Sequence, residues 1–237
     1  MNSVFDEGNE LSERLILWDI DGTLLKARRQ GGLPLHLEVA RNLGSKLSTI
    51  PFESAGLTDS DIIEQLLSLS GNNCDSGALK IALHELDELS VQSDLTTIFE
   101  VLPGVVEALE YMKSNSWDIG VLTGNTFRRA MSKIEKIELT GFISQKFIFT
   151  CNPGESREDI AKRAHSVLQN FDVQKTTIIG DTPADIFVAR QVGYNAISVA
   201  TGKFDLENLA RHKPDLLLKN FHSSLTKVAE FFNSQGN

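Results

Sequence analysis

Short apolar runs alternate with amphipathic stretches along most of this chain, and this alternation limits the available folds more than any other feature. Strands that are apolar along their whole length are typical of parallel sheets, because helices cover both faces of such sheets. We therefore expect an α/β fold in which a parallel sheet has helices on both faces. The expected strands are residues 15–20, 119–122, 147–150, 176–179, 196–199 and 216–218.

The alternation stops between residues 27 and 99, where the apolar spacing is helical and no strand is expected. The helical patterns cover residues 37–47, 59–69 and 79–89. A plain connection between a strand and a helix usually has about 2 to 6 residues, so a helical insert of this size predicts a second, smaller domain. We expect a core formed by residues 1–26 and 101–237 and a small helical domain formed by residues 27–100. A helical decoration that does not move is the alternative.

The composition excludes several classes of protein. The 237 residues include 23 Lys and Arg against 32 Asp and Glu, which gives a formal net charge of −9. This balance argues against a general basic surface for nucleic acid, so an anionic substrate must meet a local cation. No apolar run approaches the roughly 20 residues that cross a bilayer, which argues against a membrane partner.

Cys74 and Cys151 are too few for a disulfide framework, and their spacing is not that of a zinc site. The first ten residues include Asp6, Glu7 and Glu10, a pattern unlike that of a signal peptide. We therefore expect reduced cysteines and a cytoplasmic location.

Two acidic residues follow the first expected strand in the segment DIDGT, residues 19–23. Alternate residues of an extended segment point to the same side, so Asp19 and Asp21 are expected together at the carboxyl edge of the sheet. Two like charges there require a cation or a shared proton. An acidic turn at Gly22 is the purely structural alternative.

A second polar segment, Thr123, Gly124 and Asn125, follows the strand at residues 119–122 and precedes an expected helix. A hydroxyl and free amides at a helix N-terminus bind phosphate, so these three residues are candidate phosphate ligands. Ordinary helix capping is the alternative.

A third segment, GDTPAD at residues 180–185, places Asp181 at the end of a strand and Asp185 in the first turn of an expected helix. With Asp19 and Asp21 they bring several carboxylates to one edge of the sheet. Such oxygen-rich clusters suit Mg²⁺, which takes one or two carboxylates together with substrate phosphate. We expect Asp181 to bind the metal and Asp185 to support the site.

Through these three segments the chain resembles the haloacid dehalogenase superfamily of hydrolases. Residues 19–23 are similar to the nucleophile loop of that family, residues 122–125 to its hydroxyl motif and residues 180–185 to its acidic motif. The resemblance spans essentially the whole chain. It implies a Rossmann-like core, Mg²⁺ as cofactor and a helical cap between the first two motifs.

The resemblance also implies individual roles. Asp19 corresponds to the nucleophile, which also binds the metal. Asp21 corresponds to the acid that protonates the leaving oxygen and then activates water, its backbone carbonyl also contacting the metal. Thr123 corresponds to a phosphate ligand. The Lys of the family's remaining motif is missing, and Arg157 is the nearest substitute, with Lys162 as its rival and a solvated helix residue as the alternative.

In the insert, the segment GLTD at residues 56–59 resembles a segment of phosphoglycolate-phosphatase-like members, which suggests contact with substrate. The competing account, which we favour, is a helix start in which Thr58 and Asp61 form a capping box.

The resemblance favours a Mg²⁺-dependent phosphatase for a small phosphorylated metabolite, of the phosphoglycolate-phosphatase-like kind. Asp21 argues against a dehalogenase, because dehalogenation leaves no alkoxide to protonate. A phosphomutase remains an alternative, although the family's mutases more often have an apolar residue where Thr23 lies. A catalytically silent regulator that binds a phosphate ligand is the other alternative.

Overall fold

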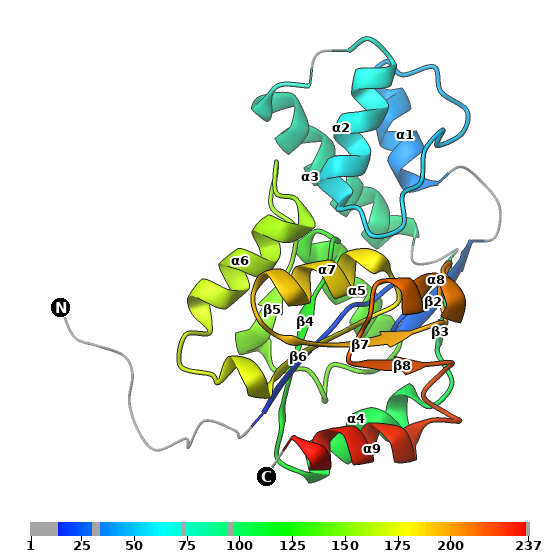
Figure 1. Cartoon of the computed structure of the whole chain (residues 1–237). Helices are drawn as coiled ribbons and strands as arrows, with labels where there is room; N and C mark the ends of the chain where they lie inside the picture. The colour runs from blue at the N-terminus through cyan, green and yellow to red at the C-terminus, as the bar shows by residue number, and fades with distance from the viewer. Residues whose placement is uncertain (1–13, 30–33, 73, 94–96, 236–237) are drawn as a thin grey trace.

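The computed structural model describes residues 14–29, 34–72, 74–93 and 97–235 (Figure 1). Six strands form one sheet in the order β5-β4-β1-β6-β7-β8, and every neighbouring pair is parallel. The α/β prediction is therefore confirmed, with all six expected strands present. The strands are β1 (Leu15–Trp18), β4 (Asp118–Leu122), β5 (Ile148–Phe149), β6 (Thr176–Gly180), β7 (Asn195–Val199) and β8 (Leu216–Leu218).

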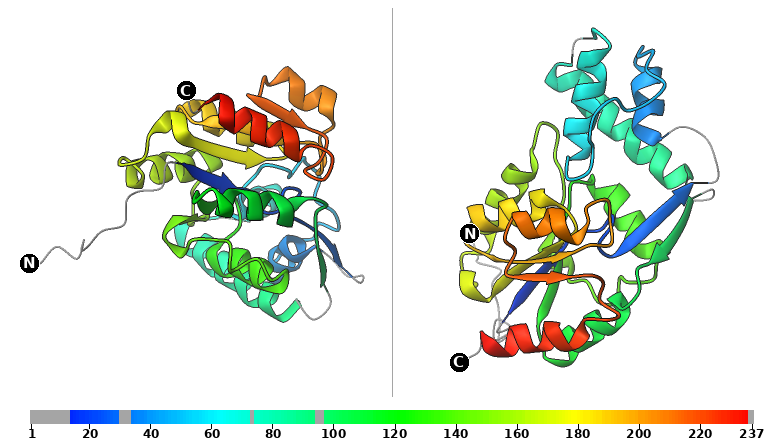
Figure 2. Two further views of the ribbon diagram at one scale, coloured as in Figure 1. Left: turned by 90° about the horizontal axis from the view of Figure 1, so that it is seen from below. Right: turned by 45° about the vertical axis from the view of Figure 1, so that its right-hand side comes forward.

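Helices cover both faces of this sheet, as both views of Figure 2 show. One face carries α4 (Val105–Ser114), α5 (Phe127–Lys136) and α9 (Leu225–Ser234). The other face carries α6 (Arg157–Val167), α7 (Pro183–Gln191) and α8 (Leu206–Arg211). Short 3₁₀ helices at Gln145–Phe147 and Val173–Lys175 lead into β5 and β6.

The central strand β1 joins the two hydrophobic cores. Successive side chains of a strand point to opposite faces, so Ile16 and Trp18 pack with α4, α5 and α9. Leu15 and Leu17 pack with α6, α7 and α8. All four side chains are fully buried. Burial on both faces explains why the strand is a continuous apolar run in the sequence.

The helical insert lies over the carboxyl edge of the sheet (Figure 1). Its helices are α1 (Leu35–Asn42), α2 (Asp59–Leu69) and α3 (Ser76–Ser93). They share a hydrophobic core of their own, in which Leu37, Ile63, Leu66 and Leu86 are almost completely buried. The insert therefore has the separate core that a second packing unit needs.

Two strands connect the insert to the sheet, and the expectation of no strand between residues 27 and 99 was wrong at its edges. Strands β2 (Leu25–Arg29) and β3 (Thr97–Val101) form an antiparallel ribbon, visible in the right-hand view of Figure 2. The sequence of β2 is mostly polar, and Lys26 pairs with Glu100 across the ribbon at 2.8 Å. The two strands are far apart in the sequence, so no hairpin turn signals their pairing. The expected domain boundaries, after residues 26 and 100, fall inside this ribbon.

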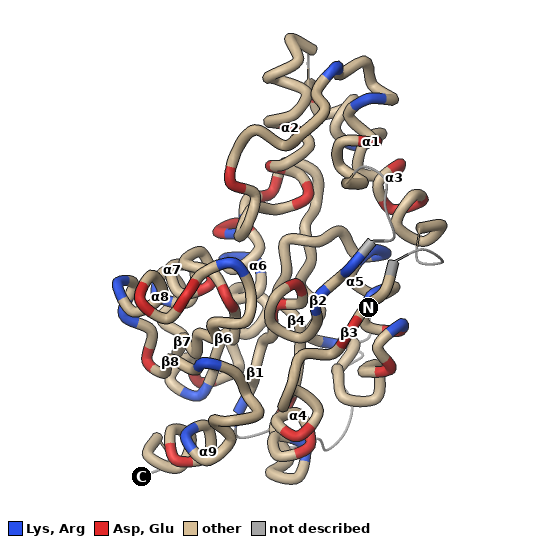
Figure 3. The backbone as a smooth tube through the Cα atoms, turned by 90° about the vertical axis from the view of Figure 1, so that its right-hand side faces the viewer, with Lys and Arg blue, Asp and Glu red and all other residues tan. Residues whose placement is uncertain are grey.

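Charged residues of both signs are interspersed along the insert and the core (Figure 3). Among the described residues, no helix combines the length and the apolar character needed to cross a membrane. Cys74 and Cys151 are both free thiols. The acidic start, residues 1 to 10, lies outside the described residues.

Candidate active site

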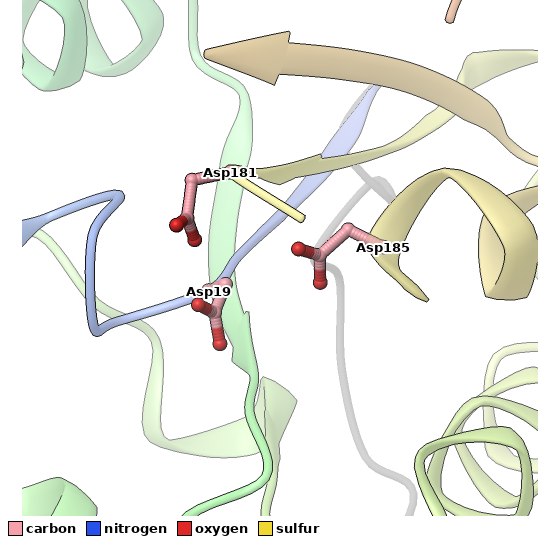
Figure 4. Close-up of side chains that lie close together, drawn as sticks. All are labelled: Asp19, Asp181 and Asp185. Atoms are coloured by element: carbon pink, nitrogen blue, oxygen red, sulfur yellow. The ribbon is translucent and has the colours of Figure 1, made fainter. Parts of the chain in front are cut away.

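Three buried carboxylates meet at the carboxyl edge of the sheet (Figure 4). Asp19 follows β1, Asp181 follows the neighbouring strand β6, and Asp185 lies in the first turn of α7. One oxygen from each carboxylate lies within 4.8 Å of the others. The parallel pairing of β1 and β6 brings together acids that are far apart in the sequence, because the carboxyl ends of parallel strands share one edge.

Glycine backbones leave the space that the Asp181 carboxylate occupies. Gly22 has a φ of +84°, and a Cβ at this position would lie 2.4 Å from Asp181 Oδ2. A Cβ at Gly202 would lie 1.7 Å from the same oxygen. Both distances are shorter than any real contact, so a side chain at either position would push the Asp181 carboxylate out of its place.

The three carboxylates repel one another. Burial raises the pKa of Asp19 to about 6 and the pKa of Asp181 to about 8; neighbouring carboxylates add to both shifts, and Arg157 opposes them. A bound cation would remove this cost, and a set of carboxylate oxygens is the donor set that Mg²⁺ prefers. The residues present therefore fit a divalent metal.

Arg157 lies inside this cluster. Its Nη2 is 2.9 Å from Asp19 Oδ1 and also donates to Asp185 Oδ1. Its Nε is buried without a hydrogen-bond partner within the described part of the chain. The rival, Lys162, is exposed and pairs with Glu158 on the surface. The structure therefore places Arg157, and not Lys162, at the site.

The second polar segment lies beside the cluster. Asn125 Nδ2 donates to Thr123 Oγ1 at 3.0 Å and to Asp21 Oδ2 at 2.8 Å. Thr126 is the N-cap residue of α5, and its side chain makes no capping hydrogen bond. Asn125 thus bonds both Thr123 and Asp21, and neither Thr123 nor Asn125 is the N-cap residue of α5. Gly124 lies against the insert, because a Cβ there would be 2.8 Å from the carbonyl oxygen of Leu57.

Asp21 lies apart from the three clustered carboxylates and has a cationic partner that the sequence analysis missed. Lys133 on α5 is 5% exposed, and its Nζ lies 2.5 Å from Asp21 Oδ2. The Asp21 side chain is 44% exposed. Its partial burial raises the pKa of Asp21, but the charges of Lys133 and Arg129 bring that pKa below its usual range. Lys133 is next to Ile134, on the apolar stripe of α5, and a lysine at such a position is a signal that could have identified it.

A cavity of about 420 Å³ is lined by residues of both the core and the insert. Its wall on the core side includes Asp19, Asp21, Arg157 and Asp181. Its wall on the insert side includes His36, Gly56, Leu57, Asp59 and Ile62. A cavity of this size, with the insert as one wall, suits a small ligand.

The segment at residues 56–59 has the local structure that the sequence analysis favoured. Thr58 Oγ1 accepts a hydrogen bond from the Asp61 backbone N–H, and the Asp61 carboxylate accepts one from the Thr58 N–H. This capping box begins α2. The same segment also lines the cavity, so contact with a ligand is compatible with its structural role.

Comparison with known proteins adds a family and a set of relatives. The family model of haloacid dehalogenase-like hydrolases matches residues 13–193. The protein named probable phosphatase IndB from Dickeya dadantii is 23% identical over 219 residues, which cover 87% of this chain and 90% of that protein. The phosphoglycolate phosphatase of Agrobacterium fabrum is 26% identical over 137 residues, which cover 56% of this chain and 57% of that enzyme.

Solved structures share the fold. A hydrolase from Pseudomonas syringae has a TM-score of 0.63 and 17% identity, and the match covers 93% of this chain and 99% of that one. A protein from Bacteroides vulgatus, named as a candidate beta-phosphoglucomutase, has a TM-score of 0.67 and 19% identity, with 96% and 91% coverage. At these identities the likeness concerns the fold alone.

Proposed function

This chain belongs to the haloacid dehalogenase-like hydrolases and is a phosphoric monoester hydrolase, and from that premise we propose that it cleaves a small phosphomonoester through an aspartyl-phosphate on Asp19. The observation that carries the proposal is the environment of Asp19. This buried carboxylate shares a cluster with two further acids and has the Arg157 guanidinium 2.9 Å away. A nucleophile and a cation for the phosphate are thereby held together.

The proposed reaction has two steps. An oxygen of Asp19 attacks phosphorus, the bond from phosphorus to the substrate oxygen breaks, and that oxygen takes a proton from Asp21. Asp21 must enter this step protonated, although Lys133 and Arg129 favour its ionised form in the unliganded site. Asp21 then takes a proton from water, the water oxygen attacks phosphorus, and the bond to Asp19 breaks to release phosphate. Splitting one difficult displacement into two easier ones is the usual benefit of a covalent intermediate. Thr123, Gly124 and Arg157, with Asn125 beside them, would hold the phosphate oxygens.

The clustered acids would also hold Mg²⁺, which would offset the negative charge of the phosphate when bound. In this proposal Asp19 and Asp181 bind it directly, and Asp21 contributes its backbone carbonyl. Asp185 already accepts hydrogen bonds from the Thr182 N–H and hydroxyl, at 3.0 and 2.7 Å, and supports the others.

The insert would act as a cap over a small substrate. The cavity of about 420 Å³ and the separate core of α1 to α3 support this division into residues 27–100 and a core of residues 1–26 and 101–237. A cytoplasmic location stays a prediction from the sequence. Because the mutase-like neighbour shares only the fold, a phosphatase remains our proposal for the chain.

The test is phosphate release from a panel of small phosphomonoesters, phosphoglycolate and sugar phosphates included, with Mg²⁺ present. We expect turnover of at least one of them, and we expect Asp19→Asn to reduce it to background. Excess chelator should stop the reaction in the wild type. Full activity of Asp19→Asn would contradict the nucleophile, and binding of phosphate without any turnover would favour the silent regulator.

A further inference from the structure

Asp59, the first residue of α2 in the insert, makes two hydrogen bonds to the loop that follows β4. The backbone N–H of Asp59 donates to the carbonyl oxygen of Gly124 at 2.8 Å. The carboxylate of Asp59 accepts a hydrogen bond from the backbone N–H of Thr126, also at 2.8 Å. These two contacts lie on either side of Asn125. The insert therefore fixes the backbone that presents this side chain.

The Asp59 carboxylate is buried and has a polar partner for each of its oxygens. It is 4% exposed, its Oδ1 lies 2.8 Å from His36 Nε2, and Arg129 Nε lies 3.7 Å from Oδ2. Burial alone would raise the pKa of Asp59, but Arg129 and His36 keep it well below the usual range. A buried carboxylate that is ionised and hydrogen-bonded on both oxygens is a strong acceptor for the Thr126 amide.

Asn125 links the position of this loop to the residues of the proposed reaction. Its Nδ2 donates to Asp21 and to Thr123, and its Oδ1 accepts from Lys133 at 2.6 Å and from Arg129 at 2.9 Å. A side chain with four such contacts has one orientation. A displacement of its backbone would disturb the carboxylate of Asp21 and the hydroxyl of Thr123 together.

We propose that Asp59 is a positioning residue that couples docking of the helical insert to the orientation of Asn125, and through Asn125 to Asp21. The insert then does more than cover the cavity, because its contact completes the geometry of the acid that protonates the leaving oxygen. This inference rests on the proposed phosphatase function for its catalytic consequence. Its structural part, that Asp59 fixes the loop at residues 124–126, rests only on the two hydrogen bonds between Asp59 and this loop.

The test compares Asp59→Ala and Asp59→Asn with the control Asp61→Asn, which weakens the capping box of α2 but leaves the contacts to the core. Single-turnover alcohol release is measured for an alkyl phosphate and for nitrophenyl phosphate. We expect Asp59→Ala to slow release from the alkyl ester by about 10- to 100-fold, because a misplacement of a reacting group by about 1 Å can cost about 100-fold. Release of nitrophenol should slow less, because this group departs without a proton. Asp59→Asn should lie between Asp59→Ala and the wild type.

Hydrogen exchange of the Thr126 amide gives a readout that needs no activity. It should accelerate in Asp59→Ala and stay as in the wild type in Asp61→Asn. Unchanged exchange in Asp59→Ala, or an equal slowing for both esters, would overturn the coupling even if the enzyme is a phosphatase. A wild-type chain that hydrolyses no phosphomonoester would instead overturn the proposed function and the catalytic part of this inference.

Discussion

The ammonium of Lys133 lies 2.5 Å from Asp21 Oδ2 and 2.6 Å from Asn125 Oδ1, so one buried lysine binds both the proposed acid and the side chain that orients it. Lys133 comes from the second turn of α5, whereas Asp21 follows β1, 112 residues earlier in the chain. Burial lowers the pKa of Lys133, and the charge of Asp21 opposes that shift. The charged form of Lys133 is therefore stabilised by Asp21.

We predict that Lys133→Met impairs catalysis more than folding. Methionine fills the volume of the lysine stem, so the apolar contacts of α5 are kept, but Asp21 loses its nearest cation. Turnover of an alkyl phosphate should fall by about tenfold or more, because Asp21 and Asn125 lose the ammonium that orients both. The measurement is kcat together with the thermal unfolding midpoint. The matched control is Lys136→Met, because Lys136 is exposed on the same helix; an equal effect of both variants would contradict a specific role.

A second prediction concerns Arg157, which contacts both Asp19 and Asp185. Arg157→Met should lower kcat/KM strongly and weaken inhibition by inorganic phosphate, because the cation nearest to Asp19 is lost. Arg157→Lys should recover part of kcat/KM and part of the phosphate inhibition, since lysine restores the positive charge but not the planar guanidinium. Lys162→Met is the control, because Lys162 lies on the surface. Phosphate inhibition that is unchanged in Arg157→Met would show that this side chain does not bind the phosphate.

The clustered acids could be predicted from the sequence because each one directly follows a strand or begins a helix. Asp19 and Asp181 end neighbouring strands of a parallel sheet, and Asp185 is four residues further on, so local pattern and sheet topology suffice to bring them together. Gly22 was also predictable as the residue that turns the chain, and its φ of +84° agrees.

The contacts of Lys133 and Asp59 could not be predicted in this way. Each depends on how two elements pack across long separations in the sequence, 112 residues for Lys133 with Asp21 and 67 for Asp59 with Thr126. In the sequence, Asp59 is one acid in the first turn of a well-capped helix, where acids are common anyway. The ribbon of β2 and β3 was not predicted for the same reason. Its two strands are far apart in the sequence, and β2 is mostly polar.

A third prediction tests the packing of the core at the start of α4. Gly104 has a φ of +85°, and a Cβ there would lie 2.0 Å from the backbone nitrogen of His222. Gly104→Ala should therefore destabilise the protein by more than the roughly 1 to 2 kcal/mol of a left-handed backbone alone. Urea unfolding measures the loss. Gly141→Ala is the control, because a Cβ at Gly141 meets nothing within 4 Å, and a similar small change in both variants would contradict the close approach.

The last prediction separates metal binding from catalysis at Asp181. The pKa of Asp181 is raised to about 8, above its ordinary value of 3.8, so without metal the ionised carboxylate costs the folded state stability as the pH rises between these values. Asp181→Asn removes this charge. Without metal at pH 8 the variant should therefore be more stable than the wild type. The difference should shrink as the pH falls to 3.8 and below, where the wild-type carboxyl becomes protonated in both the folded and the unfolded state.

Added Mg²⁺ should reverse that order. A ligand that binds only the folded state stabilises it, by about 2.7 kcal/mol at a hundred times its dissociation constant. The wild type should gain in unfolding temperature with Mg²⁺, and Asp181→Asn should gain little, because a neutral amide replaces a proposed ligand. Asp185→Asn should behave differently: Asp185 bonds the Thr182 N–H and hydroxyl at the start of α7, so losing its charge should lower stability with and without Mg²⁺. If Asp181→Asn responded to Mg²⁺ as the wild type does, the cluster would bind the metal without Asp181.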